Sequence, residues 1–305
     1  MLFKRFFLLS FLFLTSIFAI EKNQKTYKHP LVMCSMFKNE ARFLKEWIEF
    51  HKLVGVTHFY LYNNRSEDSF MEVLTPYVES GEVTLIQWDV AVTDRKSWIK
   101  AQEDAFLDGV KKSCGVAKWA AFLDIDEFIV PVVKDSIVDV LNEYEDVPAI
   151  IVNWIMFGTS DVEKIPENQL MTEVLVKRAK LTNEHHISYK SIVRPEYVEK
   201  PWTSHAFIYK KNSDPKMGKK NKTLYAVNEN REVVKKLGSG KPSYSKLQMN
   251  HYWTRDKEFF NTEKKDRLKK RHPYLDLEAY IKPFSVEKDE TILRFLPKLH
   301  KAMKS

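Results

Sequence analysis

Short apolar runs alternate with amphipathic stretches over residues 31–123. Four runs have the length and apolar character of buried strands, at residues 31–37, 57–62, 83–88 and 118–123. Between them, apolar residues recur with a helical period, which predicts helices at residues 41–54, 69–78 and 98–114. This alternation is typical of a mainly parallel sheet covered by helices on both faces. The pattern therefore predicts an α/β fold.

Polar residues are clustered directly after three of the four predicted strands. The clusters are residues 38–40, 63–68 and 124–127. In an open α/β sheet, the carboxyl ends of parallel strands share one edge, and ligands bind in the crevice there. We therefore expect these three clusters to converge on a single binding site.

The third cluster carries the clearest chemistry. Asp124 and Asp126 are two residues apart on a loop that leaves a buried strand, so both carboxylates can face outward. Oxygen ligands on a short loop suit Mn²⁺ or Mg²⁺, and such an ion commonly bridges to the phosphates of a nucleotide. His251, in the run Asn250-His251-Tyr252, is the candidate for an imidazole that completes the metal site.

The composition narrows the class of protein. The chain has 305 residues, of which 44% are hydrophobic and 30% charged, and this balance fits a globular protein with a large core. Its eight glycines form neither GxGxxG nor GxxxxGK[ST], which argues against a Rossmann dehydrogenase and a P-loop NTPase. Cys34 and Cys114 lack the paired CxxC spacing of structural zinc sites, and they are either free thiols or one disulfide.

Charge is distributed unevenly along the chain. The net charge of +8 combines −6 over residues 1–199 with +14 over residues 200–305. Such a basic C-terminal part suggests an anionic partner, such as a nucleotide diphosphate, an anionic glycan or a phospholipid surface. The basic stretch at residues 264–272 is suited to lie on anionic lipid. No RRM, KH or zinc-knuckle pattern is present, so we expect no nucleic-acid partner.

The N-terminal 25 residues have the pattern of a targeting segment. Lys4 and Arg5 precede an apolar run over residues 6–20, and polar residues follow. The run is shorter than the roughly 20 residues of a membrane-spanning helix, so it is either a signal peptide or a short anchor. Both alternatives predict association with a membrane, and neither decides which side of it the chain faces.

Several motifs occur in a fixed order over residues 31–260. They are MCSMFKNEARFLKEWIEFHKLVGVTHFYLY at residues 33–62, WAAFLDIDEFI at 119–129, FGTS at 157–160, KSIVRP at 190–195 and NHY at 250–252. In this order they resemble glycosyltransferase family 92, the former DUF23 group, and related family-2-like transferases. The resemblance implies a single GT-A-type domain over residues 26–285, with a charged helix or tail over residues 286–305.

The same resemblance implies the chemistry. Members use a nucleotide-sugar donor and a divalent cation, usually Mn²⁺, and some transfer galactose from UDP-galactose with inversion. Asp124 would bind the ribose and the metal, and Asp126 the metal. Lys190 and Arg194 are suited to the donor phosphates, with an ion pair at a strand edge as the alternative. The implied donor-binding set is Lys38, Asn39, Glu40, Asn63, Asp68, Gln102, Asp124, Lys190 and Arg194.

An inverting transfer also needs a carboxylate that accepts the proton of the acceptor hydroxyl. Asp161 follows the FGTS motif, Glu127 follows the acidic pair, and Glu184 precedes two histidines. We favour Asp161, because it is the carboxylate nearest to a predicted cleft loop, whereas Glu127 has the alternative role of supporting Asp126. The acceptor is expected to be a glycan or a glycolipid.

Two other classes of protein stay open on the residues alone. One is a non-catalytic module that binds an anionic glycan or a nucleotide on a transferase scaffold. The other is a HAD-type phosphotransferase, whose DxDx[TV] loop also follows a buried strand, although Phe128 here occupies the Thr or Val position. The presence of both aspartates together with His251 favours an active glycosyltransferase.

Overall fold

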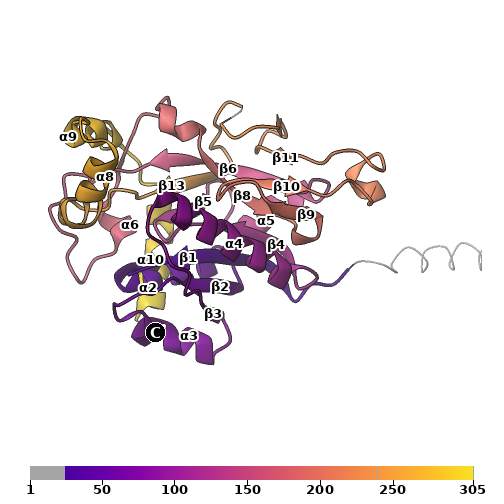
Figure 1. Ribbon diagram of the computed structural model, residues 1–305, viewed down its shortest axis with the longest axis horizontal. Coiled ribbons are helices and arrows are strands. Elements are labelled where there is room, and N and C mark those ends of the chain that lie inside the picture. Colours follow the sequence, from indigo (N-terminus) through magenta and orange to yellow (C-terminus); the bar gives the residue numbers. More distant parts are fainter. Residues whose placement is uncertain (1–24, 239, 305) are drawn as a thin grey trace, which may run out of the picture.

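One large mixed sheet organises the protein (Figure 1). The computed structural model describes residues 25–238 and 240–304. The sheet has the strand order β12-β11-β6-β8-β4-β1-β2-β3, and β13 pairs with both β5 and β6. Its strands are β1 (His29–Phe37), β2 (His58–Asn63), β3 (Val83–Gln87), β4 (Ala117–Phe122), β5 (Glu127–Pro131), β6 (Ala149–Met156), β8 (Tyr189–Val193), β11 (Ala226–Val227), β12 (Val233–Val234) and β13 (Leu247–His251).

The first part of the chain forms the parallel side of this sheet. β1 pairs in parallel with β2 and β4, and β2 pairs in parallel with β3. The connecting helices are α2 (Ala41–Leu53), α3 (Phe70–Glu79) and α4 (Arg95–Ser113). Every strand and helix predicted in this region is present. α4 begins at Arg95 rather than at residue 98, because Asp94 and Ser97 form a reciprocal capping box.

The antiparallel strand β8 lies in the middle of the sheet. It pairs with β4 on one side and with β6 on the other, antiparallel to both. β6 therefore runs in the same direction as β4, and the carboxyl ends of both strands lie at one edge. The predicted α/β domain with a mainly parallel sheet is confirmed, and β8 is its antiparallel insertion.

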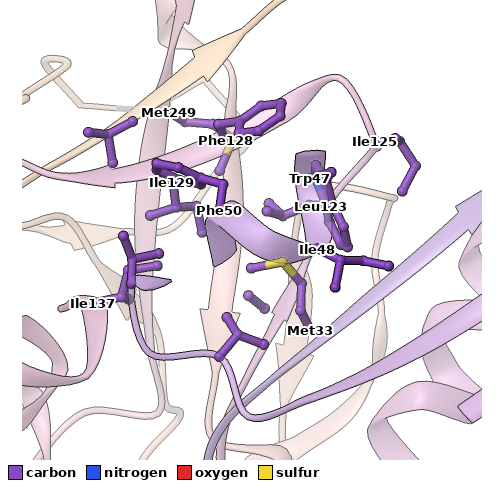
Figure 2. Packing of buried hydrophobic residues seen from close by; sticks show 14 of the residues in the cluster. Met33, Trp47, Ile48, Phe50, Leu123, Ile125, Phe128, Ile129, Ile137 and Met249 are labelled. Carbon is purple, nitrogen blue, oxygen red and sulfur yellow. The ribbon is translucent and has the colours of Figure 1, made fainter. Parts of the chain in front are cut away.

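Helices cover both faces of the sheet. The larger core includes α2, α3, α5 (Ile137–Leu141) and α10 (Leu296–Met303), and a second core lies beneath α4. Phe50 of α2 packs against Phe128 of β5, and both lie in one apolar cluster with Trp47 and Ile129 (Figure 2). The indole Nε1 of Trp47 also donates to the carbonyl of Glu127 at 2.9 Å. This packing holds the backbone directly after the acidic pair.

A helical segment follows β13, and we call residues 253–285 the C-terminal helical segment. It contains α7 (Lys257–Phe259), a π-helical turn (Phe260–Lys264), α8 (Lys265–Arg271) and α9 (Leu277–Ile281). α8 and α9 lie together beside the sheet in Figure 1. The loop after β6 contacts this segment closely, since a Cβ atom on Gly158 would lie 2.8 Å from the carbonyl carbon of Phe284.

The last part of the chain returns to the main core. α10 packs against α2, and Ile292, Phe295 and Leu299 are buried. β14 (Glu287–Lys288) pairs with β7 (Lys177–Arg178), and β9 (Val198–Pro201) pairs with β10 (Phe207–Tyr209). A short helix, α6 (Met171–Val174), lies nearby. The charged stretch over residues 286–305 thus contains a helix with an apolar side in the core.

Two further expectations concern the membrane and the cysteines. Among the described residues, no helix is long and apolar enough to cross a membrane. The predicted signal peptide or anchor lies outside the described residues, except for Lys25. Cys34 is buried and Cys114 is exposed, and both are free thiols. Of the two alternatives that the sequence allowed, the structure therefore shows free thiols rather than a disulfide.

Candidate active site

The loops after β1 and β2 are joined to each other. The N–H of Asn39 donates to Oγ of Ser66 at 2.9 Å, and Oδ1 of Asn39 accepts from the N–H of Glu67 at 2.8 Å. Asp68 accepts from the N–H of Ala41 at 2.7 Å, at the start of α2. Asn39 has a left-handed φ of 55°, a conformation that asparagine adopts more readily than most residues. The first two polar clusters therefore converge as predicted.

The side chains of these loop residues are largely engaged within the protein. Nδ2 of Asn63 donates to Oε1 of Gln87 at 2.7 Å, and its Oδ1 accepts from the N–H of Ser66 at 2.9 Å. Asn39 and Asp68 likewise hydrogen-bond to backbone groups, whereas Lys38 is exposed at the same edge. Asn39, Asn63 and Asp68 therefore shape the edge of the site.

Asp124 follows β4 and is held by two side chains from different elements. Its Oδ1 accepts from Nε2 of Gln102 on α4 at 2.5 Å, and its Oδ2 accepts from Nζ of Lys190 on β8 at 2.8 Å. Burial opposes ionisation, but the ammonium of Lys190 outweighs it, so the pKa of Asp124 lies below its ordinary value. The side chain keeps 35% of its surface exposed, which leaves part of the carboxylate open to a ligand.

Glu127 supports this arrangement from inside the protein. Its Oε2 accepts from the N–H of Asp124 at 2.8 Å and lies 3.5 Å from Nζ of Lys190. Burial raises the pKa of Glu127 well above its ordinary range, although Lys190 opposes this effect. The side chain has no exposed surface. Glu127 thus supports the backbone of Asp124, and it does not face a cleft in which an acceptor hydroxyl would lie.

Asp126 faces side chains from the C-terminal part of the chain. Its Oδ1 lies 3.5 Å from Nε2 of His251 on β13, and its Oδ2 lies 3.3 Å from Nζ of Lys264. Burial opposes ionisation, but the ammonium of Lys264 and the contact with His251 outweigh it, so the pKa of Asp126 lies well below its ordinary value. This carboxylate is therefore ionised at neutral pH.

An ion pair connects Glu40 to the same side of the site. Nη2 of Arg255 donates to Oε2 of Glu40, and the buried guanidinium lies 3.8 Å from the ring centroid of Phe43 and 4.4 Å from that of Phe259. Burial raises the pKa of Glu40, although Arg255 opposes this effect. Nε and Nη1 of Arg255 have no hydrogen-bond partner among the described residues. The first polar cluster thus reaches the acidic pair through Arg255, and the second cluster is joined to the first by the contacts of Asn39 and Asp68.

The residues around Asp126 fit a hard divalent cation in part. A carboxylate and an imidazole converge there, and Nδ1 of His251 is buried without a hydrogen-bond partner among the described residues. Asp124 is instead directed toward Gln102 and Lys190. Within residues 25–238 and 240–304, no group of three or more His, Cys, Asp or Glu side chains is spaced to hold a metal. Mg²⁺ sites commonly use one or two carboxylates together with substrate phosphates, and Asp126 suits such a site.

Arg194 is not brought to this edge of the sheet. It follows the carboxyl end of β8, whose antiparallel course carries it toward the amino end of β4, whereas Lys190 lies near Asp124. Its guanidinium donates to the carbonyl of Glu145 and to Glu196. This placement corrects the expectation that Arg194 contacts the donor phosphates, and it agrees with the alternative of an ion pair.

The two other candidate bases lie outside the acidic cluster. Asp161 follows β6, on the correct edge of the sheet, but its side chain is 70% exposed and pairs with Lys177 at 2.5 Å. That hydrogen bond lowers the pKa of Asp161. Glu184 is exposed in a short 3₁₀ helix (Glu184–Ile187), and the neighbouring His185 packs on Tyr280 and Phe284. Asp161 and Glu184 are both exposed, and both belong to segments at the edge that carries Asp124, because Glu184 precedes the amino end of the antiparallel strand β8.

Sequence reasoning missed Arg255 and Lys264. We assigned the stretch that contains Lys264 to a lipid-facing helix on the basis of its charge. A signal was nevertheless present, because Phe260, Lys264 and Leu268 recur every four residues and all three are buried. The spacing places Lys264 on the apolar side of its helix, where a lysine requires a nearby counter-charge.

This fold and this site define a class of protein. An acidic pair at the carboxyl end of a central strand, in a mainly parallel α/β sheet, is the arrangement expected of a GT-A-type glycosyltransferase. The family model described as "Glycosyltransferase family 92" matches residues 29–277. The chain therefore belongs to glycosyltransferase family 92, which confirms the resemblance seen in its motifs.

Relatives of this chain occur in plants and animals. Family 92 proteins from Ricinus communis and Oryza sativa subsp. japonica are 31% and 34% identical over 173 and 179 residues, covering 55% and 57% of this chain. These matches cover 29% and 28% of the relatives, less than a third of their length. A beta-1,4-galactosyltransferase from Caenorhabditis elegans is 29% identical over 119 residues, which is 38% of this chain and 28% of that protein.

Proposed function

We propose that this protein transfers a sugar from a nucleotide-diphosphate donor, a UDP-sugar, to a glycan or glycolipid acceptor. The observation that carries the proposal is the acidic pair Asp124 and Asp126 at the carboxyl end of β4, with its surrounding lysines and histidine. Membership of family 92 supports a glycosyltransferase. The galactosyltransferase named among the relatives supports galactose as the transferred sugar.

The residues divide into three roles under this proposal. The edge shaped by Asn39, Asn63 and Asp68 receives the nucleoside, and the open part of Asp124 faces the ribose. Asp126 and His251 would hold Mn²⁺ or Mg²⁺, which when bound neutralises charge on the diphosphate leaving group. Lys190 keeps Asp124 ionised and oriented.

Inversion requires a base on the acceptor side, and we assign this role to Asp161. It lies after β6, at the same edge of the sheet as the acidic pair, and its ionised carboxylate is exposed. The acceptor hydroxyl would lose its proton to Asp161 as its oxygen forms a bond to C1 of the sugar from the face opposite the diphosphate. The bond between C1 and the diphosphate oxygen breaks in the same step, and UDP leaves with that electron pair. The N-terminal apolar segment would keep the protein at a membrane, beside a lipid-linked or membrane-bound acceptor.

The proposal is tested with the full-length protein in mild detergent. UDP is titrated by calorimetry with and without Mn²⁺, and release of UDP from UDP-galactose measures turnover. Asp126→Asn should abolish Mn²⁺-dependent UDP binding, while the control Asp135→Asn, at an exposed carboxylate paired with Arg294, should leave it unchanged. Asp161→Asn should retain UDP binding and lower turnover at least tenfold. Absence of UDP binding by the wild type, with or without Mn²⁺, would overturn the UDP-sugar proposal.

A further inference from the structure

Lys264 is a buried lysine whose closest charged partner is a site carboxylate. Its side chain is 11% exposed, and its Nζ lies 3.3 Å from Oδ2 of Asp126. Its neighbours along the helix, Lys269 and Lys270, are exposed. Burial of an ammonium is unfavourable unless a counter-charge compensates for the lost hydration. The position of Lys264 therefore depends on an anion in the site.

The backbone that carries Lys264 is unusual. Lys264 ends the π-helical turn Phe260–Lys264, between α7 and α8. π-helical turns are rare, and they occur frequently at functional sites. This turn directs the ammonium inward, 5.5 Å from the ring centroid of Trp253 and 5.8 Å from that of Phe259. Phe259 is held in turn by the guanidinium of Arg255, so the wall beside Lys264 is fixed.

The charges around Asp126 suggest what replaces that carboxylate as the partner of Lys264. Asp126 and Glu40 face Lys264 and Arg255, so two negative groups balance two positive groups. A divalent cation held by Asp126 and His251 would compete with Lys264 for the negative charge of the Asp126 carboxylate. A nucleotide sugar contributes two negative phosphates, so the cation and the diphosphate together leave the net charge of the cluster unchanged. The diphosphate is therefore the anion that restores a partner to Lys264.

We propose that Lys264 is a diphosphate-binding residue of the donor site, which pairs with Asp126 in the free protein and with a donor phosphate in the complex. This inference rests on the proposed function and deepens it. It assigns to Lys264 the phosphate contact that Arg194 cannot make from the opposite edge of the sheet. It also predicts that Lys264 has opposite effects on two ligands: it weakens the binding of the cation alone and strengthens the binding of the nucleotide diphosphate.

The experiment compares three probes on the full-length protein and on Lys264→Met. Mn²⁺ alone, followed by electron paramagnetic resonance, should bind Lys264→Met severalfold more tightly, because the competing ammonium is gone. UDP in the presence of Mn²⁺ should bind at least tenfold more weakly, because a charge-assisted contact is lost. Uridine, which has no phosphate, should bind both proteins equally. Lys264→Arg should recover part of the UDP affinity, and the control Lys269→Met, at an exposed lysine, should change none of the three.

The outcomes separate this inference from the proposed function. If the wild type binds UDP and Lys264→Met binds it equally well, Lys264 makes no phosphate contact and only the inference fails. If Lys264→Met loses Mn²⁺, UDP and uridine in parallel, its role is structural and the inference fails as well. If the wild type binds no UDP, the proposed function and the inference fall together. Should Lys264→Met not fold, Lys264→Gln carries the same expectations for the three probes.

Discussion

Asp124 and Asp126 lie two residues apart, yet they belong to two differently built sides of the site. Asp124 is held by Gln102 on α4 and by Lys190 on β8, and both side chains are buried. Asp126 is faced by His251 and by Lys264 from the C-terminal helical segment. Each aspartate thus has one lysine, but the two lysines differ in what surrounds them.

This difference indicates which of the two lysine–aspartate contacts a bound ligand could replace. Lys190 is 1% exposed and approaches two carboxylates, Asp124 and Glu127, so its position is set by the fold. Lys264 approaches a single carboxylate at the longer distance of 3.3 Å, on a segment that has only a small apolar cluster of its own. We therefore regard the contact between Lys190 and Asp124 as part of the framework, and the contact between Lys264 and Asp126 as the one that a ligand can replace.

The largest expected effect comes from removing Lys190, and removing Lys264 gives the comparison. Lys190→Met should lower the free energy of unfolding by about 3–5 kcal/mol, because it leaves buried carboxylates without a counter-charge. Lys264→Met should lower it less, by about 2 kcal/mol, because Asp126 keeps His251 and the methionine packs on aromatic rings. Urea unfolding followed by tryptophan fluorescence measures both.

A matched surface control accompanies these two variants. Lys118 forms a more exposed ion pair with Glu145, and Lys118→Met should change the free energy of unfolding by about 0–1 kcal/mol. If Lys190→Met and Lys264→Met lowered the free energy of unfolding equally, the two lysines could not be distinguished as a framework residue and a ligand-binding residue.

Acid should lower the free energy of unfolding, because the folded protein holds two buried histidines in their neutral form. Nδ1 of His51 donates to the carbonyl of Trp47, and its Nε2 accepts from the N–H of Ile129, so the ring is buried in its neutral form. Burial lowers the pKa of His51 to about 3 and that of His186 to about 4. An unfolded imidazole titrates near pH 6.5, so below that pH the unfolded state binds more protons and stability falls.

We expect a loss on the order of 2 kcal/mol for each of these histidines between pH 7 and pH 4.5. Urea titrations at a series of pH values measure this slope, and His51→Gln should make it shallower even if it lowers stability at pH 7. A free energy of unfolding that stays constant over this range would show that the histidines are not held neutral.

The smallest effect is expected at Arg194. Its partners Glu145 and Glu196 lie away from the acidic pair, so Arg194→Ala should change the affinity for UDP with Mn²⁺ by less than twofold. Calorimetry on this variant, beside Lys264→Met, compares the two candidate phosphate contacts directly. A tenfold loss of UDP affinity in Arg194→Ala would restore that residue to the donor site and weaken the assignment of Lys264.

The part of the fold that could be predicted from the sequence is the part built from local signals. Strands β1 to β4 are continuous apolar runs, and α2 to α4 have helical periodicity, so their existence and order were predicted. The antiparallel course of β8 was not predicted, because the direction of a short apolar strand depends on which distant strands it pairs with. This course decides that Lys190 reaches Asp124 and that Arg194 does not.

The sequence by itself determined the α/β class, the family and the location of the acidic pair, because each depends on residues close together in the chain. Only the tertiary structure decided which cation faces each aspartate. Lys264 and Asp126 are 138 residues apart, and no local pattern records a contact over that separation. The stability of the contact between Lys264 and Asp126 depends on burial and on charge balance. Both exist only once distant segments of the chain have packed together.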